Sequence, residues 1–224
     1  MDTERRARFF PRVTHIALAA AAVTLLGLSL LSATGCASGF NDLPQEPGYS
    51  PRLTRFTYLE EGKLVALAAD TQATIQREKQ KFVPVGVAIA NLGLPTSLTL
   101  NRESFTLVDD QGKKYSLATV QEARSLAGLQ TYDLKLEEPF VSVLTTRFTT
   151  LQPVPMVFFP VQTTDPQYAR RGIVRDRVEL PLRSWAWDIL YFPHPEGKLK
   201  GRKYELWLAA PELKEPVFVR FAVK

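Results

Sequence analysis

The chain has 224 residues, of which 45% are hydrophobic and 23% are charged. This is the composition of a globular protein, and it excludes a disordered, collagen-like or multi-span membrane protein. The single cysteine excludes intrachain disulfides and any zinc or iron–sulfur site that needs several thiolates. Part of the net charge of +5 lies in the opening residues, so the rest of the chain is too weakly basic to indicate a nucleic-acid binder.

Residues 1–35 have the three-part layout of a secretory signal. A cationic opening precedes an apolar run over Val13–Leu31, and small residues lead from there to Cys36. A run of this length also suits a membrane-spanning helix, so length alone does not separate a cleaved leader from a retained anchor. The only cysteine lies directly after the small residues, and this position favours a leader that is cleaved there.

The letters LSATGC over residues 31–36 resemble the lipobox of bacterial lipoproteins. The resemblance implies that the Cys36 thiol takes a diacylglyceryl group and becomes the new N-terminus, so that acyl chains hold the protein at a membrane. It also favours the outer membrane, because Ala37 and not Asp follows the cysteine. The family prefers Leu where this chain has Ala33, so simple secretion and a retained transmembrane helix both stay open.

Residues 36–52 are rich in Pro and Gly and poor in apolar side chains, which predicts a flexible tether. The remainder, 53–224, shows no sustained amphipathic helix and is long enough for a single domain with a full core. Short alternating runs between turn residues predict strands there. These strands are expected at 54–59 and 63–68, 83–90, 105–108 and 115–117, 174–180, 185–192, 204–208, and 217–223.

Two short helices are expected to connect strands. In the first, over 119–128, Thr119 and Glu122 form a capping box and Gly128 ends the helix. The second, over 165–172, begins with Asp-Pro and ends with Gly.

The order of elements after residue 63 resembles that of uncharacterised bacterial lipoproteins with an immunoglobulin-like domain. The likeness runs through a hydrophobic strand ending near Asn91, the strand Phe105–Val108, the turn DDQG, Tyr115, a capped helix and the closing VFVRFAV run. It implies an all-β, immunoglobulin-like β-sandwich with two short connecting helices, preceded by the helical leader. Because such sandwiches host many unrelated functions, the resemblance implies no particular activity.

Residues suited to catalysis or metal binding are few. His194 is the only imidazole after the leader, and its place between two prolines indicates a solvent-facing turn. Neighbouring carboxylates point apart on a strand or a turn, so adjacent acidic pairs are not expected to form a site. Asp109 and Asp110 are expected to shape a hairpin turn instead. The acidic pairs are Glu60 and Glu61, Asp109 and Asp110, and Glu137 and Glu138.

Two groups of residues are candidates for facing a ligand. Trp185 and Trp187 share one face of a predicted strand with Ile189 and Tyr191, which favours a place in the core; on an exposed face the indoles could stack on sugar rings. Basic residues gather in two connections, which we interpret as solvated loops or, if the fold joins them, as a patch for anionic polymers. The basic residues are Arg170, Arg171, Arg175 and Arg177 in the first connection, and Lys198, Lys200, Arg202 and Lys203 in the second.

These observations predict a non-enzymatic, lipid-anchored protein of the bacterial envelope that faces the periplasm and acts as a protein-interaction or scaffolding module. The alternatives are a module that binds a glycan or an anionic envelope polymer, and a single-pass membrane protein with a periplasmic β-sandwich. The expected partners are a membrane, through N-terminal acyl chains, and an envelope protein. No nucleic acid, metal or cofactor is expected.

Overall fold

A computed structural model describes residues 45–126, 128–161 and 173–224. The expected leader over 1–35, Cys36 and the expected helix over 165–172 lie outside the described residues. Within the described ranges, no helix is both long and apolar enough to cross a membrane.

The largest sheet has five strands, which are, in sheet order, β1 (Thr57–Glu61), β2 (Val65–Asp70), β3 (Phe82–Asn91), β9 (Ser184–Pro193) and β7 (Gln152–Pro153). β3 pairs with β9 along its whole length, from Phe82 opposite Pro193 to Asn91 opposite Ser184. Neighbouring strands run antiparallel except β7, which joins β9 in parallel.

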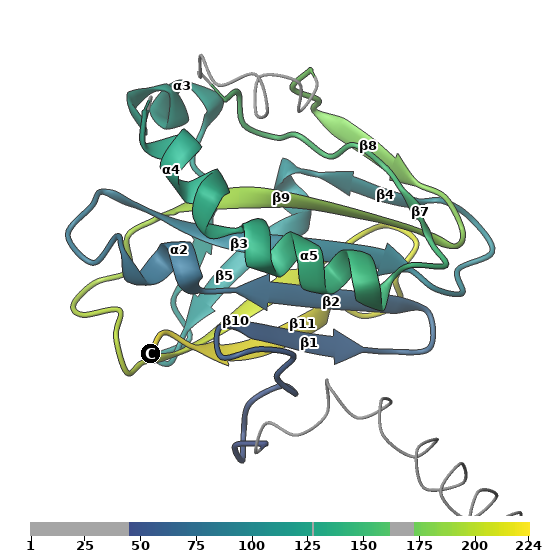
Figure 1. The fold of residues 1–224 in the computed structure, drawn as a ribbon, viewed down its shortest axis with the longest axis horizontal. Coiled ribbons are helices and arrows are strands. Elements are labelled where there is room, and N and C mark those ends of the chain that lie inside the picture. Colours follow the sequence, from purple (N-terminus) through teal and green to yellow (C-terminus); the bar gives the residue numbers. More distant parts are fainter. Residues whose placement is uncertain (1–44, 127, 162–172) are drawn as a thin grey trace, which may run out of the picture. The chain divides into compact units, whose positions relative to one another are not determined.

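A second, four-stranded antiparallel sheet lies behind the first in Figure 1. Its strands, in sheet order, are β11 (Val217–Ala222), β10 (Lys203–Leu208), β5 (Phe105–Asp109) and β6 (Lys114–Ser116). A two-stranded sheet is formed by β4 (Leu98–Asn101) and β8 (Arg177–Leu180). Strands therefore dominate the described residues, as predicted, and each predicted strand coincides in part with an observed one. β4 and β7 were not predicted.

One hydrophobic cluster fills the space between the two large sheets. β3 contributes branched residues at alternate positions, among them Val85 and Val87, while β10 contributes Leu206 and β11 contributes Val219. Alternate residues of these strands therefore face a shared apolar core, as the sequence pattern predicts.

Helices cover the other face of the five-stranded sheet, and Figure 1 shows α5 (Glu138–Arg147) lying across it. α5 packs Phe140 and Leu144 onto this face. Small side chains beneath the helix let its backbone come close to the sheet. The small residues in this contact are Ala66 and Ala68 of β2 and Ala88 and Ala90 of β3.

The helical layer corrects the prediction of two short connecting helices. The capping box of Thr119 and Glu122 is confirmed at the start of α3 (Val120–Ala123), but the chain continues helical beyond Gly128. The further helices are α2 (Gln72–Ile75), α4 (Leu129–Leu136) and α5, with single 3-10 turns η1 (Arg102–Ser104) and η2 (Arg124–Leu126).

The sequence of α5, EPFVSVLTTR, does not predict a helix, because its β-branched residues favour strands. Pro139 suits the first helical turn, and packing on the alanine-rich face supplies the stabilisation that propensity does not. Tertiary contact therefore overrides local preference in this segment.

The chain is fixed to the β-rich body from Glu46 onward. The Glu46 carboxylate forms ion pairs with Arg52, at 3.3 Å, and with Lys224. The Ser50 amide donates to the Arg220 carbonyl in β11 at 3.0 Å. The last residues of the predicted tether are thus packed against the body.

Candidate functional site

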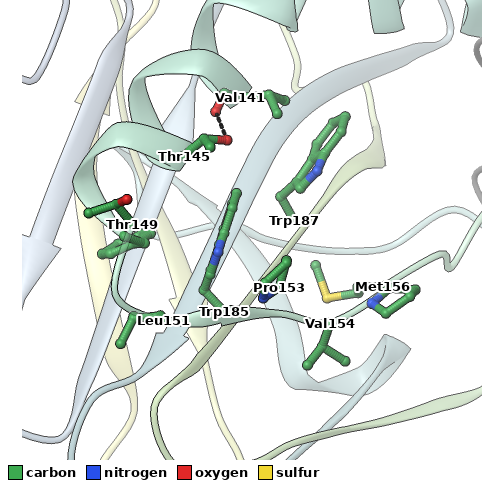
Figure 2. Close-up of a pocket in the computed structure, with 11 residues that line it drawn as sticks. Val141, Thr145, Thr149, Leu151, Pro153, Val154, Met156, Trp185 and Trp187 are labelled. Carbon is green, nitrogen blue, oxygen red and sulfur yellow. Dashed lines mark hydrogen bonds between the residues drawn. The ribbon is translucent and has the colours of Figure 1, made fainter.

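An apolar pocket of about 570 Å3 lies between α5 and the β7–β9 edge of the five-stranded sheet. Figure 2 shows Trp185 and Trp187 projecting into it from β9, with α5 on one side and the segment after β7 on the other. The lining residues are Val141, Thr145, Phe148, Thr149, Leu151, Pro153, Val154, Pro155, Met156, Trp185 and Trp187.

The two indoles share a face because they lie two residues apart on β9. In the sheet register Trp187 is opposite Ala88 and Trp185 is opposite Ala90, so small neighbours leave room for the large rings. The Trp185 ring packs on Phe148 of the α5 end, with ring centroids 5.7 Å apart. Both tryptophans belong to the contact between the sheet and the helical layer.

Exposure limits what the pair can bind. Trp185 is only 5% exposed, too little for a sugar ring to stack on its face, whereas Trp187 is partly exposed. The structure therefore places both predicted residues at a pocket wall but does not offer two open indole faces.

The chemistry of this pocket is that of apolar binding. Its lining side chains carry no titratable group. Thr145 and Thr149 supply hydroxyls, and the Thr145 hydroxyl donates to the Val141 carbonyl at 2.8 Å. Such a lining suits burial of apolar side chains from a ligand, with a few polar atoms at the rim to orient it.

The basic residues of the loop before β10 have separate environments. Lys198 and Lys200 are exposed, and Lys203 holds its ammonium 4.8 Å from the Tyr49 ring centre. Arg202 is committed to the hairpin turn, where its guanidinium pairs with Asp110 at 2.5 Å and with Asp109 at 3.4 Å.

The first basic group is only partly described, since Arg170 and Arg171 lie outside the described residues. Arg177 begins β8, where it pairs with Glu179 at 2.5 Å, and Arg175 lies shortly before it. In Figure 1, β8 lies apart from the loop before β10, so Arg175 and Arg177 do not join the second group.

His194 is not the solvent-facing turn residue that the sequence indicates. It is half-buried, and its ring nitrogens lie 2.9 Å from the Glu78 carbonyl and 2.5 Å from the Pro195 carbonyl. Because those partners are backbone oxygens, the ring fastens the end of β9 to the loop at Glu78. It does not line the pocket beside α5.

The prediction that adjacent carboxylates point apart agrees with Glu137 and Glu138 but not with Asp109 and Asp110, which both contact the Arg202 guanidinium. Asp109 shapes the hairpin turn, since its carboxylate accepts from the amides of Gln111 and Lys113 at 3.0 and 2.9 Å. Glu137 is fully buried whereas Glu138 is exposed.

A buried acidic cluster beneath the helices was not predicted. It comprises Asp70, Asp133 and Glu137, each at most 2% exposed, and its cation is Arg77, which forms an ion pair with Asp133. Asp70 accepts from the Thr57 hydroxyl at 2.5 Å, and Glu137 accepts from the Ala73 amide at 3.4 Å. The first bond links β1 to β2 within the sheet, and the second joins α2 to the α4–α5 junction.

Burial governs the protonation of this cluster. It raises the pKa of Asp133 to about 6 even though Arg77 and Tyr191 stabilise the charged form. Burial, followed by the charge of Asp70, raises the pKa of Glu137 well above its usual range. Glu137 Oε2 has no hydrogen-bond partner within the described residues.

Among the described residues, no group of three acidic, His or Cys side chains is arranged to hold a metal ion.

A glycine in an otherwise apolar strand was the available signal for this cluster. A Cβ at Gly86 of β3 would overlap the Glu137 carboxylate, so only glycine leaves space for that side chain. The glycine indicates that another group packs closely against β3 at this position. That group, the Glu137 carboxylate, comes from a helical segment that the sequence did not predict.

Comparison with known proteins identifies no family. No family model matches the chain, and no curated protein matches it. Among solved structures the chain is similar to a "putative lipoprotein (ycdA)" from Bacillus subtilis, with 14% sequence identity and a TM-score of 0.38. The match covers 73% of this chain and 38% of that chain, so this chain spans less than half the length of its neighbour. A likeness this weak establishes neither a shared fold nor a shared function.

Proposed function

We propose that the chain is a lipid-anchored, non-enzymatic protein of the bacterial envelope whose β-rich body holds a protein partner beside the membrane. We assign the two face-to-face sheets to an immunoglobulin-like β-sandwich with an added helical layer. Support for this assignment comes from two sheets, antiparallel except for the short strand β7, that share one core.

The apolar pocket beside α5 carries the proposal. Its volume of about 570 Å3 falls within the range of ligand pockets, roughly 300–1,000 Å3. A lining without titratable side chains supports binding by burial and offers no general acid or base to activate its threonine hydroxyls. We assign it to an apolar anchor residue, such as Leu, Met or Phe, from a partner segment lying across α5.

The membrane attachment rests on Cys36 and on the lipobox resemblance of the residues before it. Each buried methylene of an acyl chain contributes about 0.8 kcal/mol, so several chains on one cysteine give lasting attachment. The resemblance to bacterial lipoproteins implies that Ala37, in place of Asp after the cysteine, favours the periplasmic face of the outer membrane.

Site-specific crosslinking in cells tests the docking pocket. A photoreactive phenylalanine analogue replaces Thr145, which lines the pocket, and in a matched control it replaces Thr146, which is exposed next to it and does not line the pocket. We expect a discrete crosslinked protein from position 145 and none from position 146. Equal crosslinking from both positions, or from neither, contradicts the proposal.

Mass spectrometry of the native N-terminus tests the anchor. An acylated Cys36 supports it. An unmodified N-terminus near residue 36 indicates simple secretion, and an N-terminus upstream of Val13 indicates a retained transmembrane helix; either result rejects the lipid anchor.

A further inference from the structure

A second pocket, of about 500 Å3, lies on the outer face of the four-stranded sheet, away from the helical layer. Its lining combines an indole, three cations and three carboxylates with an apolar base: Trp207, Lys114, Lys203, Arg220, Glu205, Asp109, Asp110 and Val108. We propose that this pocket binds an acidic saccharide, a hexuronic acid unit of an envelope polysaccharide.

Strand alternation exposes the aromatic part of this surface. Along β10 Leu206 points into the core, whereas Glu205 and Trp207 lie on the outer face and are half-buried. Trp207 pairs in register with Phe218 of β11, and their rings lie 6.0 Å apart with an interplanar angle of 30°. The two rings therefore form a shallow platform on a sheet face that is open to a ligand.

Glu205 holds that platform in place. One carboxylate oxygen accepts from the Trp207 indole nitrogen at 2.7 Å, and the other accepts from the Arg220 Nε at 2.6 Å. Both oxygens are thus engaged, and the indole is oriented before a ligand arrives. Preorganisation of this kind lowers the entropic cost of binding.

The cations of the pocket are less fully engaged than its anions. The ammonium of Lys114 lies 5.3 Å from the Trp207 ring centre, and that of Lys203 lies 4.8 Å from the Tyr49 ring centre. Neither lysine has a carboxylate partner among the described residues. The nearby carboxylates of Asp109 and Asp110 are occupied by turn amides and by Arg202. The groups left to bind a ligand are therefore the ammonium groups of Lys114 and Lys203, and these favour an anion.

An acidic sugar matches both parts of the surface at once. The C–H face of a pyranose ring packs against an indole, and a ring carboxylate can pair with an ammonium that lies over that indole, as the Lys114 ammonium lies over the Trp207 ring. A ligand with charge alone would leave the Trp207 platform unused, and a neutral sugar would leave the two lysines unpaired. This site is independent of the pocket beside α5, so either proposal can fail without the other.

Calorimetric titration of the full-length protein in detergent tests the proposal, with oligogalacturonate as the probe and a neutral galactan oligomer of equal length as its control. We expect the acidic oligomer to bind more tightly than the neutral one, and salt to weaken its binding. Lys114→Gln and Lys203→Gln should each lower the affinity by about tenfold, the typical value of one charge-assisted hydrogen bond. Trp207→Leu should lower it by a similar factor.

Two variants serve as controls in the same titration. Lys200→Gln removes an exposed lysine that does not line the pocket and should bind as the wild type does. Thr145→Trp fills the pocket beside α5 and should also leave oligogalacturonate binding unchanged.

Three results would overturn the assignment. They are equal affinity for the neutral oligomer, wild-type affinity in both lysine variants, and binding of inorganic polyphosphate that is as tight as that of oligogalacturonate and insensitive to Trp207→Leu. The last result would leave only nonspecific charge attraction.

Discussion

Tryptophans on the two large sheets have the same side chain and opposite environments. Trp185 lies beneath the end of α5, is 5% exposed and packs on Phe148. Trp207 is half-buried on the outer face of the other sheet, among Lys114 and Arg220. Strand alternation therefore determines which residues share a face, whereas the layer beyond the sheet determines whether that face is buried.

The largest expected difference between these two environments is in stability. Trp185→Ala should lower the free energy of unfolding by about 3–5 kcal/mol, because it removes a large buried ring and leaves a cavity. Trp207→Ala should lower it by about 1 kcal/mol. Urea denaturation followed by far-UV circular dichroism measures both losses, and equal losses would remove the distinction between the two surfaces.

The helical layer that covers Trp185 depends on the space at Gly86. Gly86→Ala should lower the free energy of unfolding by about 3 kcal/mol, because its Cβ would overlap the buried Glu137 carboxylate. The double variant Gly86→Ala, Glu137→Ala should be less destabilised than the sum of its single variants, since the shorter side chain removes the overlap. Additive losses in a double-mutant cycle would disprove this explanation.

A smaller, pH-dependent effect comes from the Glu137 charge. Because its pKa in the folded protein is raised, Glu137 contributes stability below its unfolded pKa, and this contribution is lost as the pH rises through the folded pKa. Glu137→Gln keeps a neutral side chain at every pH, so its free energy of unfolding should increase relative to that of wild type as the pH rises from 4 to 8.

Glu138→Gln is the matched control for this pH series, because Glu138 is the exposed neighbour of Glu137. Its stability difference from wild type should stay nearly constant over the same range. Denaturation at several pH values checks both variants, and a flat difference for Glu137→Gln would show that Glu137 ionises normally.

The smallest expected effect concerns solvent access to the indoles. Trp207→Phe should remove more of the fluorescence that acrylamide quenches than Trp185→Phe removes, because Trp207 lies on the open sheet face and Trp185 is covered, while the partly exposed Trp187 contributes equally in both variants. Trp185→Phe should leave most of the quenchable fluorescence in place. If the two variants lose the same quenchable fraction, the two surfaces do not differ in exposure.

Strands were predictable because their signal is local. The alternation of Val83, Val85, Val87 and Ile89 predicted β3 and the face that points into the core between the two sheets. The helical layer was not predictable in the same way, because α5 carries strand-like residues and becomes helical through its contact with the alanines of β2 and β3.

For the candidate sites, the sequence predicted only which residues of a single strand share a face. The spacing of Trp185 and Trp187 gave their common face, but the pocket walls come from α5 and from the segment after β7, far away in the sequence. Trp207 lies at an outward position of β10. The sequence predicted the hairpin of β5 and β6 that places Lys114, but not that β10 lies between β5 and β11. Sites assembled from several elements therefore required the fold.

The attachment of Glu46 to Arg52 and Lys224 limits how far the body would lie from the lipid anchor that we propose at Cys36. Whatever its conformation, the chain between Cys36 and Glu46 spans at most about 3.3–3.6 Å per residue, or about 35 Å in total. A partner bound to the body would then stay within a limited distance of the membrane surface. Inserting residues between Cys36 and Glu46 should increase that distance without altering either pocket.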